Sequence, residues 1–167
     1  MNKVMRFQIA DYLGVKGTGA TPEYHLMNVG FTAMNESPSP KVSTQPFIGD
    51  KNASSDITGY ENSFSYDTQL VVDEEAIRAL LKVAHDQLTG EDAIFDYVRV
   101  DLYDAVTGSA NTYKARKFKV CVEAGDISGD PADVVTTSGT LHQIGDLVQG
   151  SFSTATKTFT EAKAPTI

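Results

Sequence analysis

Apolar and polar side chains alternate along most of the chain, with a period of two that predicts β-strands. The clearest example runs from residue 60 to 70, where Phe64, Tyr66 and Thr68 lie on one side and polar residues lie between them. Such a strand has one buried and one solvated face. The same criterion predicts further strands over 1–13, 24–32, 93–105, 113–124, 139–144 and 147–160. We expect 93–124 to form a hairpin that turns at 104–109, and 147–160 to form a terminal hairpin that turns at 154–157.

Residues 73–89 have a helical period instead. Apolar residues spaced three and four apart form one stripe, which consists of Ile77, Leu80, Leu81, Ala84 and Leu88. Asp73 is a suitable N-cap, and Gly90 is a suitable C-terminal stop. We expect one amphipathic helix over about 73–89 that packs this stripe onto a sheet.

Residues 35–59 follow neither period. This segment contains Pro38, Pro40 and Pro46, and few large apolar residues besides Phe47 and Ile48. A segment of this length without an evident element is uncommon inside a compact domain. We predict a long extended arm or hairpin over about 36–58 that becomes ordered on a partner, with a mobile surface loop as the alternative.

Together these elements predict a mainly β protein with a single domain over 1–167. The fold class is a β-sandwich or flattened barrel with one flanking α-helix and the long arm. The lone cysteine, Cys121, excludes an intramolecular disulfide, and it alternates within a strand as a small apolar side chain. Residues 1–10 lack the apolar run of a signal peptide, and no stretch is long enough to span a membrane. We therefore expect a protein made in a reducing cytoplasm, with no membrane partner.

The charge disfavours nucleic-acid binding. The formal net charge is −8 and the pI is about 4.7, so the protein repels polyanions. Its basic residues cluster only at Lys114, Arg116, Lys117 and Lys119, which divide between the two faces of a strand. We expect these cations to pair with acidic residues of a neighbouring strand or subunit.

Motifs for catalysis or cofactor binding are missing from the sequence. The glycines of 14–19 have the wrong order for a phosphate-binding loop. The histidines His25, His85 and His142 have no second ligand at metal spacing. The acidic segment 125–139, with Asp126, Asp130 and Asp133, does not match an EF-hand. We therefore predict no catalytic, cofactor-binding or metal-binding residues, and a protein that is not an enzyme.

Two stretches resemble the major tail proteins, or tail tube proteins, of bacteriophages. Residues 30–38 (GFTAMNESP) and the proline-rich arm resemble the start of that family. Residues 139–152 (GTLHQIGDLVQGSF) look like its ending, and 153–160 look like its terminal turn. The order of arm, strand, single helix, hairpin, polar loop and terminal hairpin is also similar. The resemblance covers roughly 30–160.

This resemblance implies a structural virion protein that self-assembles as stacked hexameric rings into the tail tube through which DNA passes. The arm would make the contacts between rings, with the candidate residues Ser37, Pro38, Pro40, Pro46, Phe47, Ile48, Asp50 and Lys51. Acidic side chains would line the lumen and keep DNA from adhering, with the candidates Asp101, Glu123, Asp126 and Asp130. The implied partners are further copies of the chain, the tape-measure and tail terminator proteins, and baseplate or distal tail proteins. The implied location is the phage tail, after synthesis in the host bacterial cytoplasm, and no cofactor is implied.

Two other classes of function stay open at this point. One is a related phage-like tail part, such as a head–tail joining protein or the inner tube of a contractile device. The other is a monomeric β-sandwich binding module, which would carry exposed aromatic side chains and normally an export signal.

Overall fold

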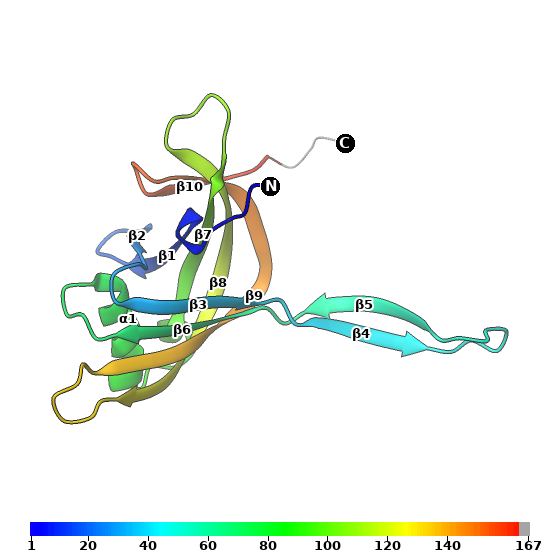
Figure 1. Ribbon diagram of the computed structural model, residues 1–167, viewed down its shortest axis with the longest axis horizontal. Helices are drawn as coiled ribbons and strands as arrows, with labels where there is room; N and C mark the ends of the chain where they lie inside the picture. Colours follow the sequence, from blue (N-terminus) through cyan, green and yellow to red (C-terminus); the bar gives the residue numbers. More distant parts are fainter. Residues whose placement is uncertain (164–167) are drawn as a thin grey trace.

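The computed structural model describes residues 1–163 and consists mainly of antiparallel strands with one α-helix (Figure 1). An 8-stranded sheet has the order β2-β1-β7-β8-β9-β6-β3, and β10 pairs with β9 beside this path. Its strands are β1 (Ile9–Lys16), β2 (Pro22–Leu26), β3 (Phe31–Ser37), β6 (Ser63–Gln69), β7 (Ile94–Ala105), β8 (Thr112–Ser128), β9 (Thr136–Ser153) and β10 (Thr158–Glu161). Within the described residues the sheet does not close, because its end strands β2 and β3 do not pair with each other. The predicted mainly β fold is confirmed, and it has the open form of a β-sandwich with a flanking helix.

The long strand β9 holds the sandwich together. It pairs with β8 along its length, with β6 through its first half and with β10 near its end. The sequence predicts two separate strands here, divided at 145–146. The structure instead has a register shift opposite Phe118, where Gly145 adopts a positive φ of 66°. This backbone conformation is strained for most residues but open to glycine, so the strand bends there and continues.

Several predicted strand bounds are wrong. The first strand begins at Ile9, because Arg6–Gln8 form a short 3-10 helix, η1. The predicted strand 24–32 is split at 27–30, and Gly30 has a φ of 81° before β3 begins. The acidic segment is shorter than predicted, because β8 continues to Ser128 and β9 starts at Thr136.

The apolar interior has two parts, one on each face of β7. The larger cluster lies under the helix and includes Phe64, Tyr97, Phe118 and Leu141. The smaller cluster consists of Tyr12, Val98, Val100, Ala115 and Phe152. Since Tyr97 belongs to one cluster and Val98 to the other, the middle of β7 is buried on both faces.

The helix α1 spans Glu75–His85, so it is shorter than the predicted 73–89. Its N-cap is Glu74, without a side-chain hydrogen bond, which corrects the assignment to Asp73. It also ends before Gly90, because Leu88 N–H donates to the Val83 carbonyl at 3.0 Å. Gln87 has a φ of 49°, so a glutamine takes the left-handed position that glycine usually holds after a helix. Gly90 instead opens a second 3-10 helix, η2 (Gly90–Ala93).

The side chains that α1 buries are Ala76, Ile77, Ala79, Leu80 and Val83. The predicted stripe is therefore right at Ile77 and Leu80. Leu81, Ala84 and Leu88 are only half-buried. The buried face is rotated toward the small alanines, which let the helix approach the sheet.

The predicted arm is confirmed as an extended hairpin. Strands β4 (Pro40–Gln45) and β5 (Ser54–Tyr60) form a separate 2-stranded sheet. In Figure 1 this hairpin projects far from the rest of the molecule, along the longest axis. We call residues 40–60 the arm and the remaining described residues the body.

Candidate assembly surface

The arm makes its hydrogen bonds within itself and exposes its side chains. β4 and β5 pair antiparallel, and the hydroxyls of Thr44 and Ser55 lie 2.8 Å apart across the hairpin. Every side chain of β4 is exposed, and on β5 only Gly59 is half-buried. An isolated two-stranded hairpin is at best marginally stable in water. A partner that covers the arm would therefore stabilise its hairpin conformation.

The exposed side chains of the arm include several large apolar ones. Val42 and Ile57 are directly opposite partners on one face, and both are more than half exposed. At the far end Phe47 is 61% exposed and Ile48 is fully exposed. Single exposed apolar residues are ordinary, but their concentration on one slender projection is typical of an interaction surface.

A partly buried ion pair lies at the root of the arm, by which we mean residues 36–40 and 60–62. Glu36, on β3 next to the arm, accepts hydrogen bonds from both terminal nitrogens of Arg116 on β8, at 2.8 and 3.0 Å. Asn62, at the other end of the arm, donates its side-chain amide to Glu36 at 3.4 Å. Both ends of the arm therefore meet at one carboxylate.

The charges at this root hold Glu36 ionised. Burial alone would raise the pKa of the Glu36 carboxyl, but the hydrogen bonds and charge of Arg116, together with the charge of Arg99, hold that pKa below its ordinary value. The hydrogen bonds to Glu36 raise the pKa of Arg116. Two-point contact of this kind fixes direction as well as distance, so it orients the arm.

A second layer of buried charge lies behind this root. Arg99 on β7 places Nη1 at 3.5 Å from Glu36 Oε2 and Nε at 3.6 Å from Asp11 Oδ1. The Tyr97 hydroxyl donates to Asp11 at 2.5 Å, and Arg6 pairs with the other Asp11 oxygen. Burial, followed by the charge of Asp11, raises the pKa of Tyr97 well above its ordinary value, so the hydroxyl keeps its proton. We call Asp11, Glu36, Tyr97, Arg99 and Arg116 the ionic network.

The sequence predictions missed this network. Asp11 and Arg99 are almost fully buried, although both residue types are usually exposed. Their only signal in the sequence is a charge within an apolar run, at Asp11 before Tyr12-Leu13 and at Arg99 between two valines. Such a charge indicates a buried polar contact, but its partner comes from distant strands.

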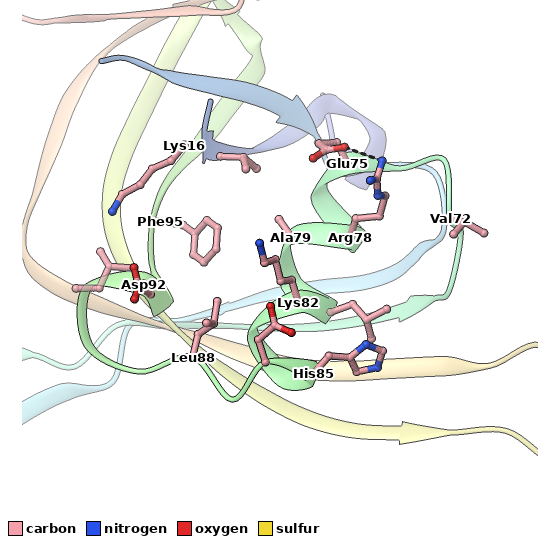
Figure 2. A pocket seen from close by; sticks show the side chains of 14 residues that line it. Lys16, Val72, Glu75, Arg78, Ala79, Lys82, His85, Leu88, Asp92 and Phe95 are labelled. Carbon is pink, nitrogen blue, oxygen red and sulfur yellow. Dashed lines mark hydrogen bonds and ion pairs between the residues drawn. The ribbon is translucent and has the colours of Figure 1, made fainter. Parts of the chain in front are cut away.

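A groove lies on the body beside the helix. Figure 2 shows α1 on one side of it and the segment with Asp92 and Phe95 on the other. Its volume is about 750 Å³, and apolar side chains of Val15, Ala79, Leu81, Leu88, Ile94 and Phe95 line it. Lys16 and Lys82 stand at its rim, and Arg78 there is paired with Glu75 at 3.2 Å. We call this hollow the α1 groove.

The residues predicted to make arm contacts lie near the two ends of the arm. Pro46, Phe47, Ile48, Asp50 and Lys51 are all in the connection between β4 and β5, at the tip of the arm. Pro40 begins β4, and Ser37 ends β3 with Pro38 directly after it. The structure thus divides the eight candidates between a tip and a root. Their contacts with another ring stay a prediction.

The predicted acidic residues do not form one patch. Glu123 and Asp126 border the same shallow hollow near the end of β8, and Asp130 lies in the following loop. Asp101 lies toward the other end of the hairpin, since its neighbour Val100 pairs with Ala115. The Glu123 carboxylate is also paired with His142, whose Nε2 lies 2.5 Å from Glu123 Oε2. Whether any of these four faces a channel stays a prediction.

The basic residues of β8 follow the predicted division between faces. Lys114 pairs with Asp104 at 2.8 Å, and Arg116 pairs with Glu36. Lys117 on the opposite face lies over the ring of Phe159, 5.2 Å from its centroid. Pairing with an acidic residue of a neighbouring strand is thus confirmed for Lys114. Arg116 instead pairs with Glu36 on β3, which is not next to β8 in the sheet.

Sites of two other kinds are absent from residues 1–163. No group of three or more histidine, cysteine, aspartate or glutamate side chains is placed there to hold a metal ion. No helix in that range has the length and apolar character needed to cross a bilayer. Cys121 is half-buried and unbonded, as its place in a strand predicts.

Comparison with known proteins gives a match in structure but none in sequence. No protein-family model matches the chain, and no curated protein matches it. Among solved structures, the chain resembles one in the six-fold symmetrised cryo-EM structure of the anti-feeding prophage baseplate. The TM-score is 0.53 at 9% sequence identity, and the match covers 89% of this chain and 96% of that one. At this identity the comparison shows a shared fold.

Proposed function

We propose that this protein is a structural subunit of a phage tail or phage tail-like particle. In the specific form of the proposal, copies join into hexameric rings that stack into the tail tube through which DNA passes. The observation that carries it is the arm, a projecting hairpin whose apolar side chains have no cover in a single copy. The protein acts by assembly and not by catalysis.

Two further observations support the proposal. The fold is shared with a chain of a baseplate whose structure was symmetrised six-fold, which agrees with a subunit that repeats around a ring. The open strands β2 and β3 leave unpaired sheet edges, which association between copies would cover. The shared fold and the unpaired edges are both expected of a subunit whose sheet edges are covered only in an assembly.

The net charge of −8 suits a tube that DNA must pass without adhering. In this proposal Asp101, Glu123, Asp126 and Asp130 are the candidates for the channel wall. Tape-measure, tail terminator and baseplate or distal tail proteins are the further partners, and the location is the particle itself.

A second candidate is a ring of a baseplate or another tail-like part, such as a head–tail joining protein or the inner tube of a contractile device. The origin of the matched structure favours it. The two candidates differ in outcome, because a tube subunit repeats indefinitely along its axis whereas a baseplate or joining ring occurs once. Concentrated protein should therefore give hollow tubes if it is a subunit of a tail tube or of a contractile inner tube, and single closed rings if it belongs to a baseplate or a head–tail joint.

The experiment is negative-stain electron microscopy of the concentrated protein, beside its mass from light scattering. The variant replaces Pro40–Tyr60 by a Gly-Gly turn, which leaves the Glu36–Arg116 pair in place. We expect tubes from the natural chain and a folded protein without tubes from the variant. Circular dichroism of the variant checks that the body is folded. Tubes from a folded variant would show that the arm is not the assembly surface.

A further inference from the structure

We propose that the root of the arm fixes the direction of the arm in the free subunit, and that this fixed direction makes the subunit competent to assemble. Glu36, Asn62 and Arg116 hold the root, and we call these three residues the clamp. The second half of the proposal rests on the proposed function, because it concerns how the arm reaches another copy. The first half concerns a single copy and can be tested without any assembly.

The clamp ties both chains of the root to the body. On the entering side, both terminal nitrogens of Arg116 bind Glu36. On the leaving side, the Asn62 carbonyl accepts a hydrogen bond from the Gln143 N–H of β9 at 3.0 Å, and the Asn62 side chain reaches Glu36. The body therefore determines the direction in which the two chains leave it.

Hydrogen-bonded pairing continues from the body into the arm. The last pair of β3 and β6 is Ser37 with Ser63, and the first pair of β4 and β5 is Pro40 with Tyr60. Between these two pairs, the Glu61 N–H donates to the Ser39 carbonyl at 3.1 Å. The arm is therefore joined to the body by paired backbone, which transmits the direction set by the clamp.

An unusual backbone conformation at Ser39 sets the angle of the arm. Ser39 has a φ of 44°, in the left-handed region that few residues other than glycine adopt, and the ring of Pro38 restricts the residue before it. Such a conformation costs free energy and persists only where the surrounding contacts impose it. In Figure 1 β3 and β6 end where the arm begins, and the arm continues away from the body as its own sheet. Ser39 lies at this change of sheet.

The clamp includes buried polar atoms that lack partners. Among residues 1–163, the buried Asn62 Oδ1 and Arg99 Nη1 have no hydrogen-bond partner, although Arg99 Nη1 lies 3.5 Å from Glu36 Oε2. Burying such atoms costs stability, and apolar side chains of similar size often stabilise a buried site at least as well as an ion pair. A two-point ionic contact adds one defined geometry. The clamp is therefore better suited to fixing a direction than to stabilising the body.

The test measures the direction of the arm in the free subunit. Spin labels are attached to Lys51→Cys near the end of the arm and to Ala155→Cys in the terminal hairpin, both exposed positions, in the full chain carrying Cys121→Ser. The labelled protein is diluted with unlabelled protein, and pulsed electron paramagnetic resonance gives the distribution of distances within one copy. We expect one narrow distribution. A broad distribution from the natural root would overturn the proposal.

Arg116→Lys separates the direction of the contact from its charge. Lysine keeps the positive charge beside Glu36 but replaces the two-point contact by a single point. We expect the distance distribution to widen about two-fold or more, with circular dichroism showing a folded protein. The matched control is Glu61→Gln, which removes the exposed ion pair with Lys41 and leaves the clamp intact, so its distribution should stay narrow. Equal widths in the two variants would contradict the clamp.

Two substitutions at Ser39 test the angle while the clamp residues stay in place. Valine is β-branched and disfavours the left-handed backbone, whereas glycine adopts it freely. We therefore expect Ser39→Val to shift the mean distance between the labels and Ser39→Gly to preserve it. An unchanged mean distance in Ser39→Val would show that Ser39 does not set the angle.

An assembly assay tests the second half of the proposal. Arg116→Lys and Ser39→Val should each slow assembly by about ten-fold, measured by light scattering, because a smaller fraction of copies has a correctly directed arm. Glu61→Gln and Ser39→Gly should assemble at the natural rate. Natural assembly by a variant whose arm has lost its direction would reject the link to assembly. If the natural chain does not assemble at all, the proposed function fails, whereas the distance measurements still decide whether the clamp exists.

Discussion

The body and the arm differ in what surrounds their apolar side chains. In the body Phe64 is 0% exposed, and its ring lies 4.6 Å from that of Tyr97 and 4.9 Å from that of Phe118. In the arm Phe47 has the same side chain at 61% exposure. A buried aromatic ring stabilises the folded chain, whereas an exposed one stabilises only the complex that covers it. The comparison places the folding core in the body, and the proposed function gives association to the arm.

The charged side chains divide in the same way. Glu36 belongs to the ionic network, where Arg116 binds both of its oxygens. Glu61, beside the last strand of the arm, pairs with Lys41 at 2.8 Å, but both partners are mostly exposed. The first pair is partly shielded from water, and the second is screened by solvent. Two ion pairs of similar length should therefore differ greatly in their effect on stability.

The largest expected effect comes from the same substitution in the two regions. Phe64→Ala should lower the free energy of unfolding by about 3–5 kcal/mol, because it leaves a cavity among Tyr97 and Phe118. Phe47→Ala should change it by less than about 0.5 kcal/mol, since the Phe47 side chain is mostly exposed and belongs to neither apolar cluster. Urea unfolding followed by circular dichroism measures both. The order should reverse in an assembly assay, in which Phe47→Ala reduces polymer mass although the protein is fully folded. A large stability loss for Phe47→Ala would mean that the arm also contributes to folding.

A smaller difference is expected for the two glutamates. Glu36→Gln should cost roughly 2–3 kcal/mol, because Arg116 and Arg99 lose the carboxylate that compensates their partly buried charges. Glu61→Gln should cost less than about 1 kcal/mol, as is usual for an exposed pair. Thermal melts of both variants at neutral pH test this. Similar costs for the two would show that solvent reaches the ionic network freely.

The pH dependence sharpens the same contrast. The pKa of Glu36 in the folded protein is below its ordinary value of 4.5, so the unfolded chain takes up the proton first as pH falls. The stabilisation from Glu36 is therefore complete above about pH 5 and is lost as pH falls from there through the lower folded pKa. The difference in unfolding free energy between the natural chain and Glu36→Gln should shrink over this range. A difference that stays constant from pH 7 to pH 3 would contradict the role of the carboxylate charge.

The body could be predicted from the sequence as far as local pattern reaches. Period-two alternation located β6 and its buried face correctly, because a strand that is half-buried carries that pattern in its own residues. The helix ends were less accurate. Its termination depends on Gln87 taking a left-handed conformation, and nothing in the residue type signals this. The arm was predictable for a different reason, since its prolines and the absence of both hydrophobic periods disfavour a place in the core.

The ionic network could not be predicted, because it depends on pairing between distant strands. Glu36 and Arg116 are 80 positions apart. The strands β9 and β6 separate β8 from β3 in the sheet, so only the folding of the sheet over itself brings the two residues together. The α1 groove has the same origin, since α1, β1 and β7 each contribute part of its lining. Sequence patterns reveal which face of an element is apolar, but not which elements meet.

Residues 139–152 are an intermediate case. Their resemblance to a known family is visible in the sequence, but only the structure explains why these residue types are needed. A Cβ at Gly139 would lie 2.5 Å from the Glu123 carbonyl oxygen, and one at Gly150 would overlap the Thr160 carbonyl oxygen. Leu141 and Phe152 are fully buried in the two clusters. The resemblance in 139–152 therefore reflects how β9 packs against β8, β6 and β10. It carries information about the fold.

This interpretation predicts a third and smallest difference between the regions. Gly150→Ala should cost about 1–2 kcal/mol, because the methyl group meets the backbone of β10 and this short edge strand must shift to accommodate it. Gly49→Ala at the tip of the arm should be neutral or slightly stabilising, since a Cβ there meets nothing within 4 Å. Hydrogen exchange should show faster opening confined to β10 in the first variant and no change in the second. If the two alanines have equal effects, close packing is not the reason for glycine at 150, and the resemblance at the end of the chain would need a functional explanation.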